Sequence, residues 1–203
     1  MNQANAILYL QQDPAIGGLI TSIEVPDFTP SGKIYYDLLD SIVSQQLSVK
    51  VATVIFKRFL ALFPDQYPHP EQLIGFEPEL LRSVGLSNQK AGYLRNVAAF
   101  SQQNDLENHH WHSMSDEEII EFLSQIKGVG KWTVQMLLMF TLGRLDVMPI
   151  DDLGIQQAMQ RLYGLETSGK ELKKQMLEIS ETWRPYRTVA CRYLWRFKDG
   201  KKV

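Results

Sequence analysis

A pair of glycines at a predicted junction between two helices is the feature of this sequence most suggestive of binding chemistry. Gly128-Val129-Gly130 stands between two stretches of helical apolar periodicity that together span residues 116–142. Glycine permits a tight turn with positive φ, and the first N–H groups of the helix that begins at Lys131 have no partner within that helix. Such groups attract phosphate. The pattern predicts a helix-hairpin-helix that grips a DNA backbone without reading base sequence; the alternative is a helical hairpin whose glycines only turn the chain.

Two adjacent acids, Asp151 and Asp152, precede a second stretch of helical periodicity and lie in a loop over residues 146–155. Side chains of neighbouring residues diverge at the start of a helix, so these two acids do not form a pair that shares one proton. An acid at this place most often caps the helix. Asp152 lies twenty positions after Trp132, close enough in sequence to the glycine hairpin to suggest a shared site.

Metal and thiol chemistry find little support in the sequence. His109, His110 and His112 cluster around Trp111, but this polar stretch lacks a fourth ligand and is expected to be a surface loop. The single cysteine, Cys191, excludes an intrachain disulfide framework and an iron–sulfur cluster built from the chain's own thiolates. This cysteine usage favours a reducing compartment.

The elements that must position these residues are helical almost throughout. Apolar residues recur at helical spacing over residues 34–46 and 51–63, and the only extended candidate is residues 22–28. Residues 64–78 and 104–114 are expected to be surface connections. The fold class is therefore all-α, with about ten helices in two lobes. The predicted helix starts are Pro14 after Asp13, Ser48, Ser87, Ser115 with Glu118, Ser168 with Glu171, and Pro185.

Composition and charge restrict the class of protein further. The 203 residues are 44% hydrophobic, which suits one globular domain, and no apolar run is long enough for a membrane span. No basic leader precedes the first apolar residues, so we expect no secretory signal. The net charge is −2, yet residues 182–203 hold seven Lys or Arg and one acid. This basic end is either a phosphate-facing surface or a solvated tail.

Residues 116–155 resemble the helix-hairpin-helix, loop and aspartate signature of the DNA glycosylase superfamily. Within it, several further segments resemble the DNA-3-methyladenine glycosylase II family, and the similarity spans about residues 34–197. The segments are K-W-T at 131–133, M-P-I-D-D-L-G-I at 148–155, W-R-P-Y-R at 183–187, S-Q-Q-L-S at 44–48, and V-G-L-S at 84–87 followed by Lys90-Ala91.

The resemblance implies the helix-hairpin-helix DNA glycosylase fold as one domain over residues 1–203, with two helical lobes and the active site in the cleft between them. It implies that Asp152, which has Ile155 three positions later, is the catalytic acid, and that Asp151 is a cap or solvated. Cleavage of an N-glycosidic bond builds positive charge on the sugar, and a fixed carboxylate stabilises that charge.

The same resemblance assigns the other site residues. Trp132, Met136, Trp195 and, more weakly, Tyr186 would line the pocket for a base flipped out of the duplex; the family often has a tyrosine where Met136 stands. Gln46 would fill the gap in the stack, with Leu47 beside it. Gly128, Gly130 and Lys131 would contact the DNA backbone. Backbone carbonyls of Ser124, Ile126 and Val129 would hold a structural Na⁺ or K⁺; no other cofactor and no iron–sulfur cluster is expected.

Glycosylases that also cut the DNA backbone place a lysine where this sequence has Trp132, so the resemblance implies a monofunctional enzyme without lyase activity. It implies a monomer acting on double-stranded DNA with alkylated purines, in the cytoplasm of a bacterium or the nucleus of a eukaryote, and no membrane partner. Two alternatives stay open. One is a glycosylase for other damaged bases, and the other is a non-catalytic DNA-binding protein that kept the hairpin.

Overall fold

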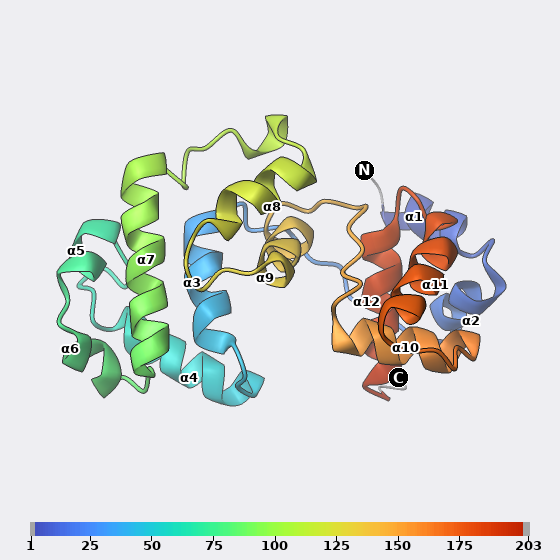
Figure 1. Ribbon diagram of the computed structural model, residues 1–203, viewed down its shortest axis with the longest axis horizontal. Helices are drawn as coiled ribbons and strands as arrows, with labels where there is room; N and C mark the ends of the chain where they lie inside the picture. The colour runs from blue at the N-terminus through green and yellow to red at the C-terminus, as the bar shows by residue number, and fades with distance from the viewer. Residues whose placement is uncertain (1–2, 201–203) are drawn as a thin grey trace. The chain divides into compact units, whose positions relative to one another are not determined.

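The computed structural model describes residues 3–200, which form twelve α-helices, a 3-10 turn and a π-helical segment, with no β-strand among them (Figure 1). The all-α prediction is therefore confirmed. The helices are α1 (Gln3–Leu10), α2 (Pro14–Ser22), α3 (Ile34–Ser44), α4 (Val49–Leu60), α5 (Pro70–Gly75), α6 (Pro78–Ser83), α7 (Asn88–Asn104), α8 (Asp116–Ser124), α9 (Lys131–Met136), α10 (Leu153–Tyr163), α11 (Gly169–Glu181) and α12 (Arg187–Lys198). None of these helices is long and apolar enough to cross a membrane.

The chain divides into two helical units, as the sequence predicts. Unit 1 combines the N-terminal segment up to Pro30 with the chain from Leu138 onward, and unit 2 comprises Ser31–Leu137. The glycine turn of the predicted DNA-binding hairpin therefore belongs to unit 2, with residues 138–142 of the predicted stretch in unit 1, and the predicted catalytic aspartate belongs to unit 1.

In unit 2, helices α4 and α7 pack on α3, and α5 and α6 pack on α7. One face of α3 is fully buried because its apolar residues recur at helical spacing, and it includes Ile34, Leu38, Leu39 and Ile42. Tyr35 of the same helix is also fully buried, and its hydroxyl donates to the carbonyl of Pro68 over 2.6 Å. Burying a tyrosine is favourable when its hydroxyl finds such a partner.

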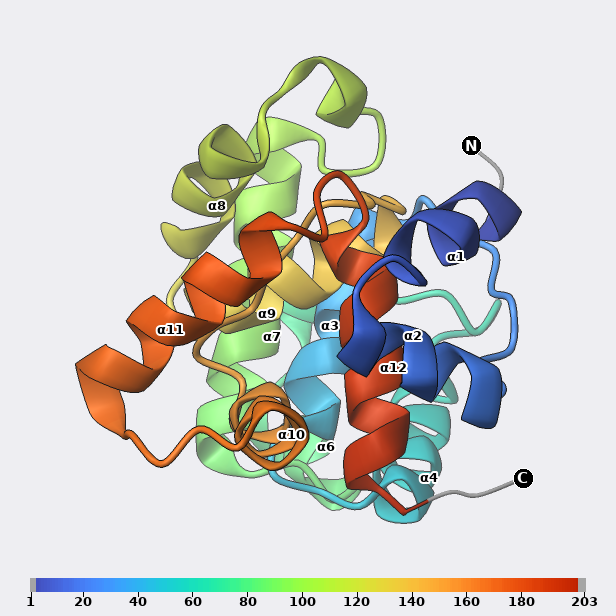
Figure 2. The same ribbon diagram turned by 90° about the vertical axis from the view of Figure 1, so that its right-hand side faces the viewer.

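In unit 1, helix α12 packs against α1, α2 and α10 (Figure 2). Asp13 caps α2 by accepting from the N–H groups of Ala15 and Ile16. The other oxygen of Asp13 accepts from the Tyr163 hydroxyl and from Nε1 of Trp183, each over 3.0 Å. One carboxylate thus joins the start of α2 to the end of α10 and to the fully buried indole that follows α11.

The predicted caps are mostly confirmed. Ser48 and Ser87 accept from the third backbone N–H of their helices, and Ser115 with Glu118 forms a complete capping box. The predicted box at Ser168 is wrong, because the Ser168 side chain makes no capping hydrogen bond. The first helical residue there, Gly169, has φ +58°, so the chain enters α11 from the left-handed region rather than in the geometry of a capping box.

The two predicted surface connections are wrong in part. Residues 64–78 contain α5, whose six residues are too few to show apolar periodicity. In residues 104–114, a 3-10 turn (Trp111–Ser113) buries Trp111, whose Nε1 donates to the carbonyl of Leu106. His109 stacks on Phe122, which gives this histidine a packing role. The extended candidate at residues 22–28 forms no strand, since α2 continues to Ser22 and residues 23–30 have no regular structure.

Candidate active site

Asp152 occupies the N-cap of α10, and its carboxylate is fixed by two donors. Oδ1 accepts from the backbone N–H of Ile155 over 2.8 Å and from Nε1 of Trp195 over 2.9 Å. The side chains of Asp152 and Trp195 are both half-buried. Two donors on one oxygen define the rotation of the carboxylate, and the start of a helix favours its negative charge. Asp152 therefore caps α10 and is also the residue predicted to carry the chemistry.

The neighbouring acid has a different environment. Asp151 is exposed, and its Oδ1 lies 2.5 Å from Nζ of Lys173 in α11. Of the two alternatives expected for Asp151, a cap or a solvated group, the structure shows the second, since Asp152 takes the cap position and Asp151 lies at the surface in an ion pair. Exposed pairs of this kind contribute little to stability. The structure separates the two acids into a fixed carboxylate and a surface carboxylate.

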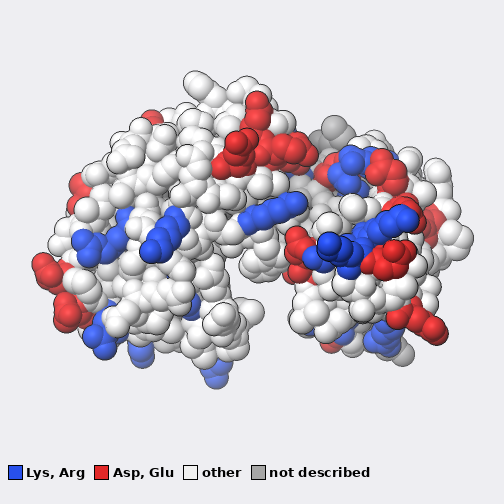
Figure 3. Space-filling view, viewed as in Figure 1, with Lys and Arg blue, Asp and Glu red and all other residues white. Residues whose placement is uncertain are grey.

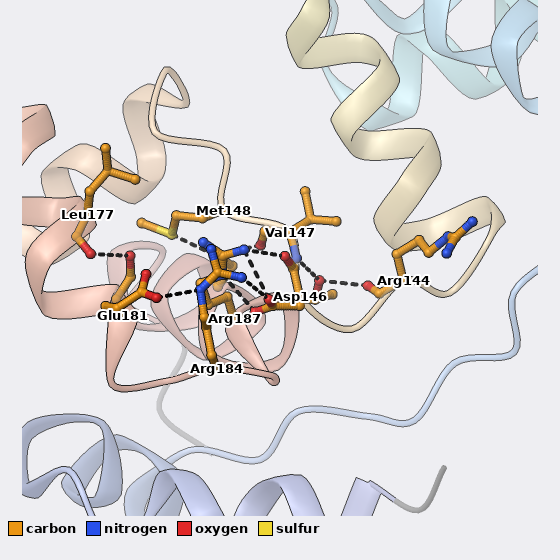
Figure 4. A network of polar contacts seen from close by, with 11 residues as sticks. Arg144, Asp146, Val147, Met148, Leu177, Glu181, Arg184 and Arg187 are labelled. Carbon is orange, nitrogen blue, oxygen red and sulfur yellow. Dashed lines mark hydrogen bonds and ion pairs between the residues drawn. The ribbon is translucent and has the colours of Figure 1, made fainter. Parts of the chain in front are cut away.

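The loop that leads to Asp152 is anchored on the first turn of α12. The Thr188 hydroxyl donates to the carbonyl of Arg144 over 2.7 Å and accepts from the N–H of Val147 over 3.1 Å. Arg187 donates to both carboxylate oxygens and the carbonyl of Asp146 (Figure 4). Arg184 adds an ion pair of 2.5 Å to the same carboxylate. This network fixes the loop from one side.

Helix α12 therefore holds the aspartate loop at two places. Thr188, Cys191 and Trp195 follow one another at positions i, i+3 and i+7, which share a face of a helix. Thr188 fixes the beginning of the loop, and Trp195 fixes its end at Asp152. The Cys191 thiol is buried between them, and burial raises its pKa, so it stays a neutral packing group.

Gly154 allows the Trp195 indole to lie against the start of α10. A Cβ atom at this position would stand 3.1 Å from Oδ1 of Asp152 and 3.1 Å from Cδ1 of Trp195. Any larger side chain must push one of these groups away. The sequence contains this glycine two residues after the aspartate, yet only the structure shows that both site residues contact it.

An aromatic row that sequence reasoning missed continues from Trp195. The Phe140 ring lies 5.9 Å from the Trp195 ring, and the Phe28 ring packs edge-on against Phe140 at 5.6 Å. Both phenylalanines are more than one-third exposed. Phe140 belongs to a π-helical segment (Leu137–Thr141), so its direction could not be read from α-helical periodicity.

Tyr186, by contrast, is not brought together with Asp152. It lies at the N-cap of α12, nine residues before Trp195, which is roughly 13 Å along a helix axis. Its ring packs edge-on against Tyr9 at 5.4 Å. The structure therefore places the weakest of the four predicted pocket residues at the other end of the helix from Trp195.

The predicted hairpin joins α8 and α9 in unit 2. Gly128 has φ +105°, and a Cβ atom there would overlap the Tyr93 ring, with Cγ only 2.2 Å away. Val129 is 5% exposed, which confirms that it pins the turn to the core. Gly130 differs from Gly128, because its φ is −99° and nothing lies within 4 Å of an added Cβ. Only the first glycine is required by the turn itself.

The residues that follow the hairpin are presented by α9. Gly130, Lys131 and Trp132 are exposed, with Trp132 at 44%, and Met136 is half-buried one turn later. Trp132 and Met136 thus share a face of one short helix in unit 2, while Trp195 and Asp152 are in direct contact in unit 1. That both sets line one base pocket stays a prediction.

The predicted gap-filling residues lie in the turn between α3 and α4. Gln46 is exposed and has φ +59°, and Leu47 is 37% exposed. The backbone of this turn is held by α7, because Nζ of Lys90 donates to the carbonyls of Val43 and Gln45.

Most of the described basic residues near the C-terminal end of the chain are held by contacts within unit 1. Arg184 and Arg187 pair with Asp146, and the guanidinium of Arg192 lies over the Phe28 ring and donates to the carbonyl of Pro26. Arg196 donates to the carbonyl of Glu24. Figure 3 shows basic and acidic side chains interspersed on the part of unit 1 facing the viewer. Lys201 and Lys202 lie outside the described residues.

A monovalent cation at the hairpin would take carbonyl oxygens from Ser124, Ile126 and Val129. The Ile126 carbonyl accepts from the N–H of Val129 over 2.9 Å, which uses one of its two lone pairs and leaves the chemistry of a carbonyl ligand intact. Backbone carbonyls are suitable ligands for such an ion, and its binding here stays a prediction. Among residues 3–200, no group of three or more His, Cys, Asp or Glu side chains is arranged to hold a metal ion.

Comparison with known proteins finds a family model and several relatives that match most of this chain. Residues 39–185 match the model of the HhH-GPD superfamily of base excision DNA repair proteins. DNA-3-methyladenine glycosylase 1 of Schizosaccharomyces pombe is 39% identical over 164 residues, which cover 80% of this chain and 71% of that protein. The Bacillus subtilis protein YfjP is 35% identical over 169 residues, and the chain spans only 58% of its length.

A solved structure of the S. pombe 3-methyladenine DNA glycosylase Mag1 in complex with abasic DNA superposes with a TM-score of 0.82. The two chains are 34% identical, and the match covers 96% of this chain and 97% of that one. The chain belongs to the HhH-GPD superfamily of base excision DNA repair proteins.

Proposed function

We propose that this protein is a monofunctional DNA glycosylase that removes alkylated purines such as 3-methyladenine and 7-methylguanine from double-stranded DNA. The observation that carries the proposal is the Asp152 carboxylate, fixed at the start of α10 by the Trp195 indole and the Ile155 amide. The S. pombe relative is named as a 3-methyladenine glycosylase, which supports the choice of lesion. The protein acts as a monomer and needs no cofactor for the reaction.

In the reaction, the bond from C1′ of the deoxyribose to the purine nitrogen breaks, and its electron pair leaves with the base. The sugar then carries positive charge, which the Asp152 carboxylate stabilises. Water adds its oxygen to C1′ and loses a proton, which leaves an abasic site. A purine alkylated at N3 or N7 already carries positive charge, so it departs as a neutral base and requires no general acid. An exposed indole such as Trp132 attracts a cationic base.

The proposal includes no strand cleavage. A lyase step needs an amine that attacks C1′, and the position that would supply it carries Trp132. Lys131 is adjacent in sequence but points roughly 100° away around the helix. We therefore expect intact abasic DNA as the product.

The hairpin supplies the DNA-binding part of the proposal. Gly130 and Lys131 are exposed at the start of α9, where backbone N–H groups and a lysine ammonium can meet phosphate oxygens. Binding of this kind weakens as salt rises, because phosphate contacts displace counterions.

The test compares base release from dimethyl-sulfate-treated DNA by the wild type, Asp152→Asn and the matched control Asp151→Asn. We expect the wild type and Asp151→Asn to release 3-methyladenine, and Asp152→Asn to lose release while it still binds a duplex with an abasic-site analogue. Binding without release by the wild type would contradict the proposal. A screen of deaminated and oxidised bases would then separate a glycosylase for other lesions from a non-catalytic DNA-binding protein.

A further inference from the structure

The turn between α3 and α4 adopts a backbone conformation that its own residues do not favour. Gln46 has φ +59°, in the left-handed region that residues other than glycine rarely occupy. Within the turn, the N–H of Gln45 donates to Ser41 and the N–H of Leu47 donates to Ser44. These bonds hold the residues on either side of Gln46.

A lysine from another helix holds the peptide that Gln46 needs. Nζ of Lys90 lies 2.7 Å from the carbonyl oxygen of Gln45 and 2.8 Å from that of Val43. The Gln45 carbonyl belongs to the peptide unit that joins Gln45 to Gln46, so fixing this oxygen restricts the φ angle of Gln46. A cation at the end of a helix also satisfies carbonyls that have no partner within the helix.

Lys90 itself is well placed for this contact. It is the third residue of α7, and its backbone N–H is bound by the cap Ser87 over 3.2 Å. The side chain is half-buried, and desolvation lowers the pKa of its ammonium group. Withdrawing an ammonium group from water is favourable only where acceptors replace the water, and the two carbonyls accept from two of its three N–H donors.

We infer that Lys90 is a positioning residue that holds the turn in the conformation that directs Gln46 and Leu47 into the base stack of damaged DNA. Lys90 acts through the backbone of the turn and touches no DNA in this role. The inference rests on the proposed function, because it assigns Lys90 to the step in which Gln46 replaces the extruded base. Without the ammonium group, the Gln45 peptide can rotate and Gln46 can return to the ordinary right-handed or extended regions.

The experiment uses the full chain with Lys90→Met, which keeps the length and apolar stem of the side chain but removes its charge. Lys33→Met is the matched control, since Lys33 is exposed at the opposite end of α3. The first measurement is the fluorescence of 2-aminopurine placed opposite a tetrahydrofuran abasic-site analogue in a duplex, which reports on a side chain entering the stack. The second is single-turnover release of 3-methyladenine from duplex DNA.

We expect Lys90→Met to lose most of the fluorescence change and to release base about 10- to 100-fold more slowly, because misplaced groups near a reacting centre carry costs of this size. Its affinity for undamaged duplex, which depends on the hairpin, should match the wild type. Lys33→Met should behave as the wild type in all three measurements. Lys90→Arg, which retains donors for both carbonyls, should recover most of the signal.

Two results would overturn the inference. One is a Lys90→Met protein with wild-type fluorescence change and release rate. The other is an equal loss of affinity for damaged and undamaged duplex, which would indicate a general structural role. If Lys90→Met does not fold, the same measurements are made on Lys90→Gln, whose shorter, uncharged side chain can donate to one of the two carbonyls. A wild type that alters the fluorescence but releases no base would refute the proposed function while the fluorescence of the Lys90 variants still tests the inference.

Discussion

The Trp195 indole donates from Nε1 to Oδ1 of Asp152 over 2.9 Å, on the same oxygen that accepts the backbone N–H of Ile155. The family resemblance of the sequence implies that Trp195 lines a base pocket. The structure adds a second role, because the indole fixes the rotation of the carboxylate that the proposed reaction depends on. Trp195 and Asp152 are therefore one hydrogen-bonded pair, and the predictions that follow treat them together.

Replacing Trp195 by Phe should slow base release more than it weakens DNA binding. The substitution keeps an aromatic ring but removes the donor to Asp152. Hydrogen bonds to charged groups contribute about 1.5–3 kcal/mol, which corresponds to a rate loss of roughly 10- to 150-fold if the carboxylate loses its orientation. Single-turnover release from methylated duplex DNA measures the rate, and titration with an abasic-analogue duplex measures the affinity. A Trp195→Phe protein with an unchanged rate would show that the indole only packs.

Gly154→Ala should disturb the same pair from the helix side. The new Cβ would lie 3.1 Å from both Oδ1 of Asp152 and Cδ1 of Trp195, so one of them must move. We expect base release to fall about tenfold, together with a loss of roughly 1–3 kcal/mol in the free energy of unfolding from overpacking.

Gly18→Ala is the matched control in the same unit. Gly18 is exposed within α2, and nothing lies within 4 Å of an added Cβ. This variant should gain about 0.5–1 kcal/mol of stability, because alanine favours a helix more than glycine does, and it should keep its release rate. Urea unfolding and base release measured on both variants test the prediction; equal effects of the two substitutions would refute it.

The long amphipathic helices and most of their caps were predictable from local signals. Apolar spacing marks α3 and α4, and Ser115 with Glu118 marks the start of α8. Such features depend only on residues a few positions apart, so one sequence is sufficient. The same reasoning missed α5, whose six residues are too few to show a repeating apolar pattern. It also misassigned Ser168, because the sequence does not show that Gly169 adopts a left-handed φ, which replaces the expected capping box.

The sequence predicted which residues form the candidate site, but not which of them contact one another. Asp152, Trp195 and the hairpin follow from a motif, whereas the hydrogen bond between Asp152 and Trp195 joins residues 43 positions apart. Phe140 was missed for a similar reason, and so was the contact of Lys90, which the sequence showed only as part of the resemblance. Phe140 lies in a π-helical segment with a different residue spacing, and Lys90 reaches carbonyls more than 40 positions away. Long-range contacts of this kind depend on how the helices pack.

The two hairpin glycines should respond differently to alanine. Gly128→Ala forces a side chain into the Tyr93 ring at a φ of +105°, so we expect it to destabilise unit 2 and abolish DNA binding together. Gly130→Ala meets open space at φ −99°, so the melting temperature should not change.

Gly130→Ala should nevertheless weaken binding to undamaged duplex about tenfold, because its methyl group stands where a phosphate must approach the backbone amides. Fluorescence anisotropy at two salt concentrations, with thermal unfolding in parallel, measures both effects. Wild-type affinity in Gly130→Ala would show that this glycine does not face the phosphate backbone.

The Asp13 carboxylate should make the free energy of unfolding depend on pH in the acid range. Burial raises the pKa of Asp13, but donors from Trp183, Ile16, Tyr163 and Ala15 outweigh it and lower the pKa below its ordinary value of 3.8. A carboxyl group whose pKa is lower in the folded state stabilises the protein above its unfolded pKa, and the contribution is lost as pH falls through the folded pKa. The wild type should therefore lose this stabilisation below about pH 4.

Asp13→Asn isolates this contribution. At pH 7 its amide would turn an N–H toward the Trp183 or Tyr163 donor, so we expect a loss of about 1–3 kcal/mol in the free energy of unfolding. The difference from the wild type should shrink when both are unfolded by urea at pH 3, because the wild-type carboxyl group is then largely protonated when unfolded. Asp151→Asn, which alters an exposed carboxylate, should change stability by less than about 0.5 kcal/mol at either pH. If Asp13→Asn and the wild type differ in free energy of unfolding by the same amount at both pH values, then packing, and not the carboxylate charge, stabilises this junction.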